Sequence, residues 1–180
     1  MAITLNRTTS DEACDLLDEL LPVYVEVYSE PPYSRGPKDF EGFRSRYEQQ
    51  SSMPGFELIT ATAAEGLAGF TYGLPFLAGR WWRGALEMPP PEVKDAPKFA
   101  IVELVVRRAY RGQGLGRKLM DTLLSQRPEK YATLLANPLA PARTMYERWG
   151  WRQVGTVQSH PHWDPSHAMV LPLHGSDSSQ

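Results

Sequence analysis

The chain has 180 residues, an ordinary apolar fraction of 42% and a formal net charge of −2 at pH 7. This length suits one domain, and the small charge gives no overall attraction to nucleic acid or to a membrane surface. Cys14 is the only cysteine, which excludes an intrachain disulfide and a cysteine-based metal site. No apolar run has the length of a membrane span, and residues 1–10 lack the apolar core of a signal peptide, so we expect a cytoplasmic protein.

Strand and helix signals alternate through the first half of the chain. Residues 3–7 predict a short strand, and Ser10 or Asp11 can cap a helix that runs to about Tyr28, with Pro22 expected to kink or divide it. The segments that follow are a loop over residues 30–37, a helix over 38–50, and a hairpin of strands 56–63 and 67–74.

A long excursion over residues 75–97 carries most of the turn-forming residues and the pair Trp81 and Trp82. Long loops in compact domains are often functional. The run after it, residues 99–106, is nearly all apolar, which predicts a central strand buried on both faces. Glu103 is the single charged residue inside this strand.

The most informative motif is the turn that follows this strand, Arg111-Gly112-Gln113-Gly114-Leu115-Gly116, which opens a helix over residues 115–124. Glycines let a ligand approach the backbone, and the free N–H groups of a helix start favour an anion. Basic residues cluster over 107–118, so a pyrophosphate is the simplest ligand. The string is neither a P-loop nor a dinucleotide fingerprint, and a purely structural turn stays open.

The chain closes with a strand over residues 131–136, a helix from Pro141 to Gly150, and strands over 151–157 and 168–173. Residues 175–180 are small and polar, and we expect them to be disordered. The domain therefore spans residues 1–174.

Two motifs resemble the GNAT superfamily of N-acetyltransferases. Arg111, Gly114 and Gly116 are similar to its acetyl-CoA pyrophosphate loop, and Ala142, Tyr146 and Gly150 to its closing motif, with Trp151 at the usual aromatic position. More narrowly, the chain looks like a subgroup of uncharacterised bacterial GNAT proteins. The resemblance implies an α/β, single-domain GNAT-like fold: a mixed, mostly antiparallel central sheet with helices on both faces.

The resemblance also implies acetyl-CoA as co-substrate. Strands 99–106 and 131–136 would splay apart around its pantetheine arm, and a backbone N–H near Val105 or Val106 would polarise the thioester carbonyl. The residues expected to hold the cofactor are Leu104, Val105, Val106, Arg111, Gly112, Gln113, Gly114, Leu115, Gly116 and Arg117, with Asn137 in place of the family's usual asparagine.

Two residues are candidates for the chemistry. Tyr146 is the implied general acid that protonates the departing thiolate, although its spacing also suits a core tyrosine. Glu103 could take the amine proton or bind the ammonium group, and a salt bridge to Arg107 or Arg108 is the alternative.

Three aromatic residues are candidates for the acceptor site. Tyr33, beside two prolines, would be held still, and Trp81 and Trp82 would form a wall, although packing onto the core explains the tryptophans as well. The histidines at 160, 162 and 167 match no established metal site, so we expect no metal and place that loop near the acceptor entrance.

We therefore expect direct transfer of an acetyl group from acetyl-CoA to a primary amine of a small molecule or peptide, without nucleic acid or membrane, by an acyltransferase that could form a homodimer. A non-catalytic acyl-CoA-binding module, or an acyltransferase with another acyl-CoA donor, is the alternative. The fold alone does not choose the acceptor.

Overall fold

The computed structural model describes residues 2–174, so the expected disordered tail lies outside the described residues. The strands are β1 (Thr4–Thr9), β2 (Glu57–Ala63), β3 (Gly66–Phe76), β4 (Lys98–Val106), β5 (Tyr131–Ala136), β6 (Arg152–Val157) and β7 (Ser166–Pro172). The helices are α1 (Ser10–Ala13), η1 (Cys14–Leu16), α2 (Leu17–Tyr28), α3 (Pro37–Ser51), α4 (Pro91–Lys94), η2 (Arg108–Tyr110), α5 (Leu115–Leu124) and α6 (Pro141–Arg148). None of the helices in this part of the chain is long and apolar enough to cross a membrane.

The strands form one mixed sheet in the order β1-β2-β3-β4-β5-β7-β6. The pairs β1–β2, β2–β3, β5–β7 and β6–β7 are antiparallel, whereas β4 and β5 are parallel, with Lys98–Ala100 beside Tyr131–Thr133. A parallel pair needs a crossover connection, and the turn and α5 supply it. The expected fold class, a mixed and mostly antiparallel sheet, is confirmed.

The chain divides into two compact units. The first holds the chain up to Leu74 together with Ile101–Ser125, and the second holds Pro75–Ala100 and the chain from Gln126 onward. β3 and β4 each contribute residues to both units. In β4, the first three residues belong to the second unit, and the residues from 101 to the end of the strand belong to the first.

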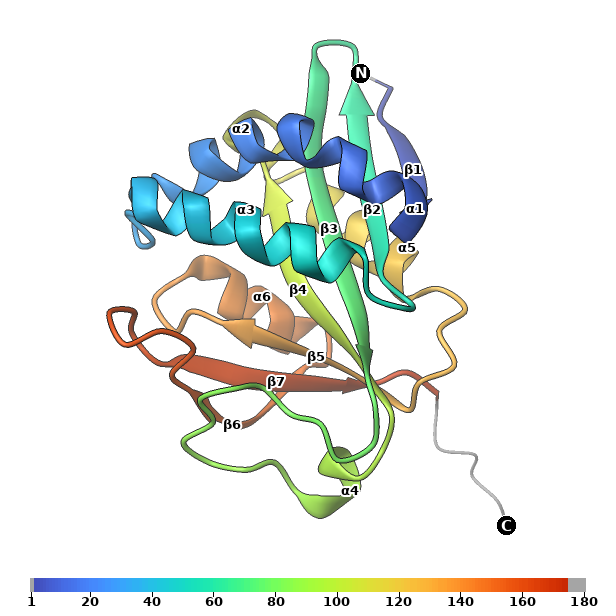
Figure 1. The fold of residues 1–180 in the computed structure, drawn as a ribbon, viewed down its shortest axis with the longest axis vertical. Helices are drawn as coiled ribbons and strands as arrows, with labels where there is room; N and C mark the ends of the chain where they lie inside the picture. The colour runs from blue at the N-terminus through green and yellow to red at the C-terminus, as the bar shows by residue number, and fades with distance from the viewer. Residues whose placement is uncertain (1, 175–180) are drawn as a thin grey trace. The chain divides into compact units, whose positions relative to one another are not determined.

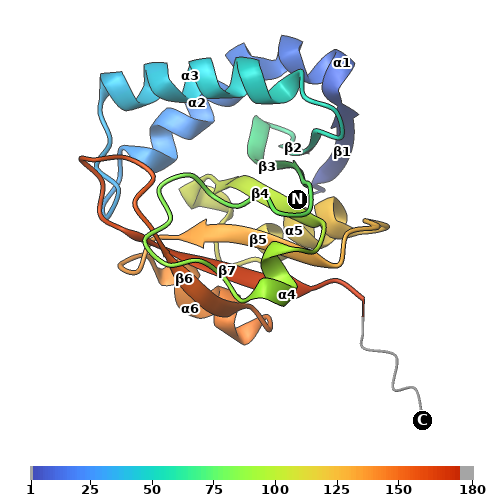
Figure 2. The same ribbon diagram turned by 60° about the horizontal axis from the view of Figure 1, so that its bottom comes forward.

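In the first unit, helices cover both faces of the strands. α2 and α3 lie on one side of β2 and β3, and α5 lies on the other (Figures 1 and 2). The core on the α2–α3 side contains Tyr24, Phe43, Tyr72 and Val105, all fully buried. The rings of Tyr24 and Phe43 stack at 3.8 Å between centroids, which locks α2 against α3. This aromatic layer lies over the face of β4 that carries Val105.

The first helix differs from its prediction. Its break is the short 3₁₀ turn η1, whereas Pro22 lies inside α2, so the expectation that Pro22 divides the helix was wrong. Pro22 lies in the second turn of α2, where the N–H group that it lacks would have bonded to the carbonyl of Asp18. The helix continues past it because its apolar face, with Leu20, Val23, Tyr24 and Val27, is buried in the core.

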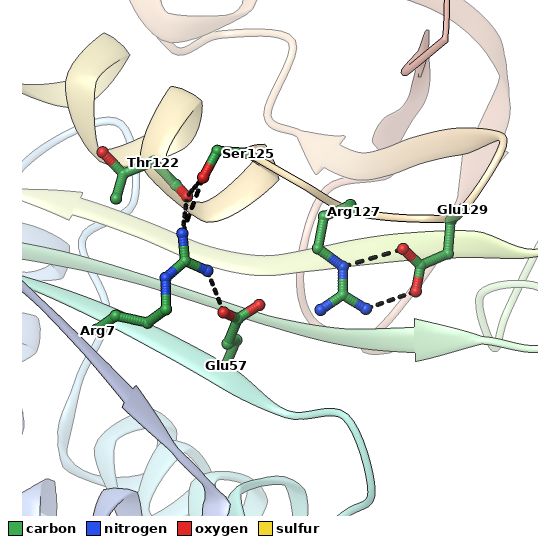
Figure 3. A network of polar contacts seen from close by, with 6 residues as sticks. All are labelled: Arg7, Glu57, Thr122, Ser125, Arg127 and Glu129. Carbon is green, nitrogen blue, oxygen red and sulfur yellow. Dashed lines mark hydrogen bonds and ion pairs between the residues drawn. The ribbon is translucent and has the colours of Figure 1, made fainter.

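Polar contacts tie the end of α5 to the edge strand β1 (Figure 3). The guanidinium of Arg7 donates to the carbonyl of Thr122 and to the hydroxyl of Ser125, the latter at 2.9 Å, and pairs with the Glu57 carboxylate. The last carbonyls of a helix lack intrahelical donors, and a cation near them also opposes the helix dipole. Arg7 therefore caps α5 from a distant part of the sequence.

The second unit has its own core. Trp81, Val93, Tyr131, Val157 and Val170 are buried together, so the excursion after β3 packs onto β5, β6 and β7 instead of extending into solvent.

Charged side chains in the second unit are buried with partners. Lys98 is fully buried, and its ammonium donates to the carbonyls of Val93, Lys94 and Ala96 at 3.1, 2.7 and 2.7 Å, which caps the end of α4. The guanidinium of Arg127 donates twice to the Glu129 carboxylate, at 2.9 and 2.5 Å (Figure 3). Bidentate pairs of this kind fix geometry as well as charge.

Candidate active site

The glycine turn has the strand–turn–helix geometry that the sequence predicts. β4 ends at Val106, and α5 begins at Leu115 with Gly114 as its N-terminal cap. Gly112 and Gly114 have φ angles of 73° and 77°, the left-handed region that disfavours residues with a Cβ. A Cβ built on either glycine meets nothing within 4 Å, so both backbones border open space. The first N–H groups of α5 have no acceptor within the helix and suit an anion at this turn.

The basic residues around the turn are partly neutralised. Arg107 pairs with Glu26 at 2.8 Å, Arg111 with Glu30 at 2.9 Å, and Arg117 with Asp121 at 3.1 Å. Arg108 and Lys118 are exposed. The first two partners lie on α2 and just after it, 81 residues away, and no sequence pattern predicted them. The local positive charge is therefore smaller than the sequence indicates, but an anion can still compete for exposed guanidinium groups.

The end of β4 is held from two sides. The Arg111 side chain donates through Nε to the Val106 carbonyl at 2.9 Å, and the Arg107 backbone N–H donates to the Ala68 carbonyl of β3 at 3.0 Å. β3 approaches so closely that a Cβ on Gly69 would lie 2.5 Å from the Val105 carbonyl oxygen. A glycine is required there, and the strand that would face the pantetheine arm is fixed in place.

Glu103 and its neighbours alternate between the faces of β4, as the sequence predicts. Ile101, Glu103 and Val105 are buried, at 3%, 7% and 0% exposed, and on the α2 side Val105 belongs to the core and Glu103 contacts Tyr28. Leu104 and Val106 point toward α5, where they lie 4.0 and 3.8 Å from the position of a Cβ on Gly116. β4 therefore presents a carboxylate on one face and packs against α5 on the other.

The Glu103 carboxylate accepts a hydrogen bond of 2.6 Å from the hydroxyl of Tyr28. Burial raises the pKa of Glu103 above its ordinary value, and the hydrogen bond and the positive charges of Arg35 and Arg46 only partly oppose this. The Glu103 carbonyl also accepts from the hydroxyl of Thr71 at 2.7 Å, which fixes the backbone. A carboxylate with a raised pKa is a better proton acceptor for an ammonium group than an exposed one.

The alternative of a salt bridge from Glu103 to Arg107 or Arg108 does not describe the site, since Arg107 pairs with Glu26 and the hydrogen bond to Glu103 comes from Tyr28. Tyr33 lies in the same cluster, because its ring contacts the ring of Tyr28 edge to face, with 4.7 Å between centroids.

Sequence reasoning missed the other members of this cluster: Tyr24, Tyr28 and Arg35. The Arg35 guanidinium donates to the Tyr24 hydroxyl at 2.6 Å and lies 4.3 Å from the centroid of the Tyr28 ring. Burial, and secondarily the charge of Glu103, raises the pKa of Tyr28 well above its ordinary value, so this phenol stays protonated and acts as a donor. The four-residue spacing of Tyr24 and Tyr28 was visible as one helix face, but nothing in the sequence placed that face over Glu103.

The second unit holds the remaining candidates. Tyr146 of α6 is 7% exposed, and its ring centroid lies 5.9 Å from Trp149 and 6.1 Å from Trp151. The side-chain oxygen of Asn137 accepts from the backbone N–H of Leu139 at 2.8 Å, which shapes the turn before α6. Asn137 precedes α6, the helix of the closing motif, and Tyr146 lies on it. The roles of both residues stay predictions.

Trp81 and Trp82 belong to the core of the second unit. Trp81 is 8% exposed, and the indole N–H of Trp82 donates to the Thr133 hydroxyl at 3.0 Å. Both side chains pack, which the sequence also allowed, and their part in an acceptor site stays a prediction.

The histidine-containing loop shows no metal geometry. Within residues 2–174 there is no group of three or more histidine, cysteine or acidic side chains that could hold a metal ion. His167 instead accepts a hydrogen bond of 2.8 Å from Arg143, and burial together with the charge of Arg143 lowers its pKa. His160 packs against His162 and Trp163, with 5.4 and 5.0 Å between ring centroids.

Part of the chain matches the model of a known domain. Residues 92–166 match the model of the acetyltransferase (GNAT) domain, and no curated protein matches the chain. A GNAT-family acetyltransferase structure from Desulfovibrio desulfuricans is similar, with a TM-score of 0.68 and 16% identity over 96% of this chain and 100% of that one.

Two further structures share the fold. An aminoglycoside 6′-acetyltransferase type Ii has a TM-score of 0.64 and 16% identity over 95% of this chain and 97% of its own. NAA60 from Arabidopsis thaliana, in complex with acetyl-CoA, has a TM-score of 0.64 and 16% identity over 95% and 98% of the two chains. Residues 92–166 thus match the GNAT acetyltransferase domain, and the solved structures share the fold of the whole chain.

Proposed function

We propose that this protein is an N-acetyltransferase that moves the acetyl group of acetyl-CoA directly to a primary amine of a small molecule or peptide. One observation carries the proposal: β4 presents the buried Glu103 carboxylate and leads, through the short turn η2, into the glycine turn that opens α5. A proton acceptor and an anion-binding turn are thus joined by a single strand within one unit. A similar structure, NAA60 from Arabidopsis thaliana, is in complex with acetyl-CoA, which supports the choice of donor.

The cofactor roles follow the strand and the turn. The backbone of Leu104, Val105 and Val106 would pair with the pantetheine arm, and a N–H group near Val105 or Val106 would polarise the thioester carbonyl. The pyrophosphate would lie at the turn and the start of α5, bound by the residues from Arg111 to Arg117. Asn137 is a further candidate contact.

The reaction needs two proton transfers from residues of this chain. Glu103 would take the proton of the acceptor ammonium or amine, directly or through a water molecule, and Tyr146 would give a proton to the departing thiolate. The open space beside Gly112 and Gly114 fits the pyrophosphate, since no side chain fills it. Tyr33 contributes to the acceptor side together with Tyr28.

Release of free thiol from acetyl-CoA in the presence of an amine panel tests this function. We expect thiol release with the wild-type protein, a fall of roughly a hundredfold in kcat for Glu103→Gln, since general base catalysis contributes about 10²–10⁴-fold, and a similar fall for Tyr146→Phe. The matched control is Glu26→Gln, which removes a carboxylate that pairs with Arg107 outside the proposed chemistry.

Three outcomes discriminate the alternatives. Binding of acetyl-CoA without turnover of any amine would favour a non-catalytic acyl-CoA-binding module. Faster thiol release from propionyl- or succinyl-CoA than from acetyl-CoA would indicate that the protein uses that acyl-CoA as its donor. Full activity of Glu103→Gln would contradict the role of Glu103 as base.

A further inference from the structure

A guanidinium group lies beside the carboxylate that we assign to the acceptor amine. The Tyr28 hydroxyl donates to Glu103 at 2.6 Å, and the Arg35 guanidinium lies 4.3 Å from the centroid of the same tyrosine ring. One aromatic ring therefore links a carboxylate at its hydroxyl end with a cation over its face.

The loop between α2 and α3 holds Arg35 in this position. Its backbone N–H donates to the Tyr28 carbonyl at 2.8 Å, and its guanidinium donates to the Tyr24 hydroxyl at 2.6 Å. The same guanidinium group also lies over the Tyr33 ring, with its carbon 5.7 Å from the ring centroid. Arg35, Tyr28 and Tyr33 are only half-buried, so a ligand can reach them. The positive charge is positioned before any acceptor binds, which reduces the entropy that binding must lose.

Two cationic groups act on the Glu103 carboxylate, the guanidinium groups of Arg35 and Arg46. An acceptor with several ammonium groups would bring a second positive charge toward these arginines, and like charges brought together cost affinity. A carboxylate near the reacting amine would instead meet a planar guanidinium, which binds carboxylates through paired hydrogen bonds.

We propose that the acceptor is an amine that carries a carboxylate, a compound of the amino acid class, with its amine at Glu103 and its carboxylate at Arg35. This inference rests on the proposed acetyl transfer and assigns Arg35 as its specificity-determining residue. In the reaction the amine nitrogen forms a bond to the acetyl carbon and the carbon–sulfur bond breaks. The amine proton passes to Glu103, the thiolate gains a proton, and the products are an N-acetylated amino acid and CoA.

The test compares acceptors that differ only in the carboxylate. Thiol release from acetyl-CoA is measured with glycine and glycinamide, with β-alanine and its amide, and with L-phenylalanine and its amide, with spermidine as the polycation. The amide group lowers the pKa of the neighbouring ammonium, so the amides are intrinsically richer in reactive neutral amine. A preference for the acids must therefore come from the protein.

We expect kcat/KM to be about ten- to a hundredfold higher for at least one acid than for its amide, the range of a charge-assisted hydrogen bond. Arg35→Met should bring this ratio close to one with unchanged affinity for CoA, whereas Arg35→Lys should keep a preference for the acid. The control is Arg44→Met on α3, an exposed arginine that pairs with Asp18 at 3.2 Å, and it should leave the ratio unchanged.

The wild-type ratio and Arg35→Lys decide the matter even if Arg35→Met does not fold. Equal or faster turnover of the amides, or of spermidine, would overturn the assignment of Arg35 and leave acetyl transfer standing. Absence of thiol release with every amine, spermidine included, would contradict acetyl transfer itself and this inference with it.

Discussion

Substitution of Gly114 by alanine separates the structural and ligand-binding roles of the glycine turn. Gly114 has φ 77° and ψ 8°, a left-handed conformation that costs a residue with a Cβ roughly 1–2 kcal/mol. The new methyl group meets nothing within 4 Å, so no clash adds to this cost. For a chain of this size, 1 kcal/mol lowers Tm by about 2–4 °C, and we expect Gly114→Ala to unfold about 2–8 °C below the wild type.

Gly116→Ala is the matched control, two residues further and inside α5. Its methyl group would lie 3.8 Å from Val106 Cγ2 and 4.0 Å from Leu104 Cδ2, which are ordinary contacts. Alanine is favoured over glycine in a helix interior by about 1 kcal/mol. We therefore expect thermal unfolding of this variant at the wild-type temperature or up to about 4 °C above it.

Calorimetric titration with CoA completes the experiment. The methyl group of Gly114→Ala enters the open space at the turn, where we place the pyrophosphate, so the Kd for CoA should rise about tenfold or more. The methyl group of Gly116→Ala points toward β4 and should leave the Kd nearly unchanged. An unchanged Tm for Gly114→Ala would refute the argument from backbone conformation, and an unchanged Kd would refute the placement of the pyrophosphate.

For three other substitutions, the structure predicts the direction in which stability or CoA affinity changes. Burial raises the pKa of Glu103, so the folded state binds this proton more tightly than the unfolded state and stability falls as pH rises from the ordinary glutamate pKa through the raised one. Glu103→Gln should therefore unfold at a higher temperature than the wild type at neutral pH while it loses turnover, and a lower Tm would contradict this account. Glu30→Gln removes the carboxylate 2.9 Å from Arg111 and should tighten CoA binding about two- to fivefold, the scale of a surface ion pair, whereas calorimetry on Glu26→Gln should show a smaller change, since its partner Arg107 precedes the turn. Lys98→Met leaves three carbonyls without their buried donor and should lower the unfolding free energy by roughly 2–4 kcal/mol, and denaturant unfolding with a wild-type midpoint would contradict that role.

The sequence predicted those elements best whose limits depend on local chemistry. α5 spans Leu115–Leu124 and β5 spans Tyr131–Ala136, as predicted, because the glycine turn ends where the helix begins and a mostly apolar run defines the strand. The first helix was predicted less well, since its break depends on a 3₁₀ turn at η1 that no residue pattern marks.

The candidate site was only half visible in the sequence. Glu103 stands out as the one charge in an apolar strand, but its partner Tyr28 is 75 residues away and on a helix. Arg111 was expected to offer its charge to an anion, yet it pairs with Glu30 across 81 residues. Contacts of this range depend on how helices pack over a sheet, and a single sequence carries no periodic signal for them.

The sequence also could not predict where the tryptophan pair lies. Trp81 and Trp82 lie in a segment rich in turn formers, which made a surface role as reasonable as a core role. Their burial comes from the strands of the second unit, which present an apolar face that the segment covers. Loop composition cannot predict such packing, because it depends on the neighbouring face.

Calorimetric titration of acetyl-CoA into the wild-type protein and into Arg111→Ala tests the central claim most directly. We predict micromolar binding to the wild type and about ten- to a hundredfold weaker binding to the variant, since a charge-assisted contact to a phosphate contributes roughly 1.5–3 kcal/mol. The two proteins should show the same Tm to within a few degrees, because the Arg111 side chain is 42% exposed and its ion pair adds little stability. Absence of acetyl-CoA binding to the wild type, or equal affinity of both proteins, would contradict the assignment of the glycine turn and of the acetyl transfer that depends on it.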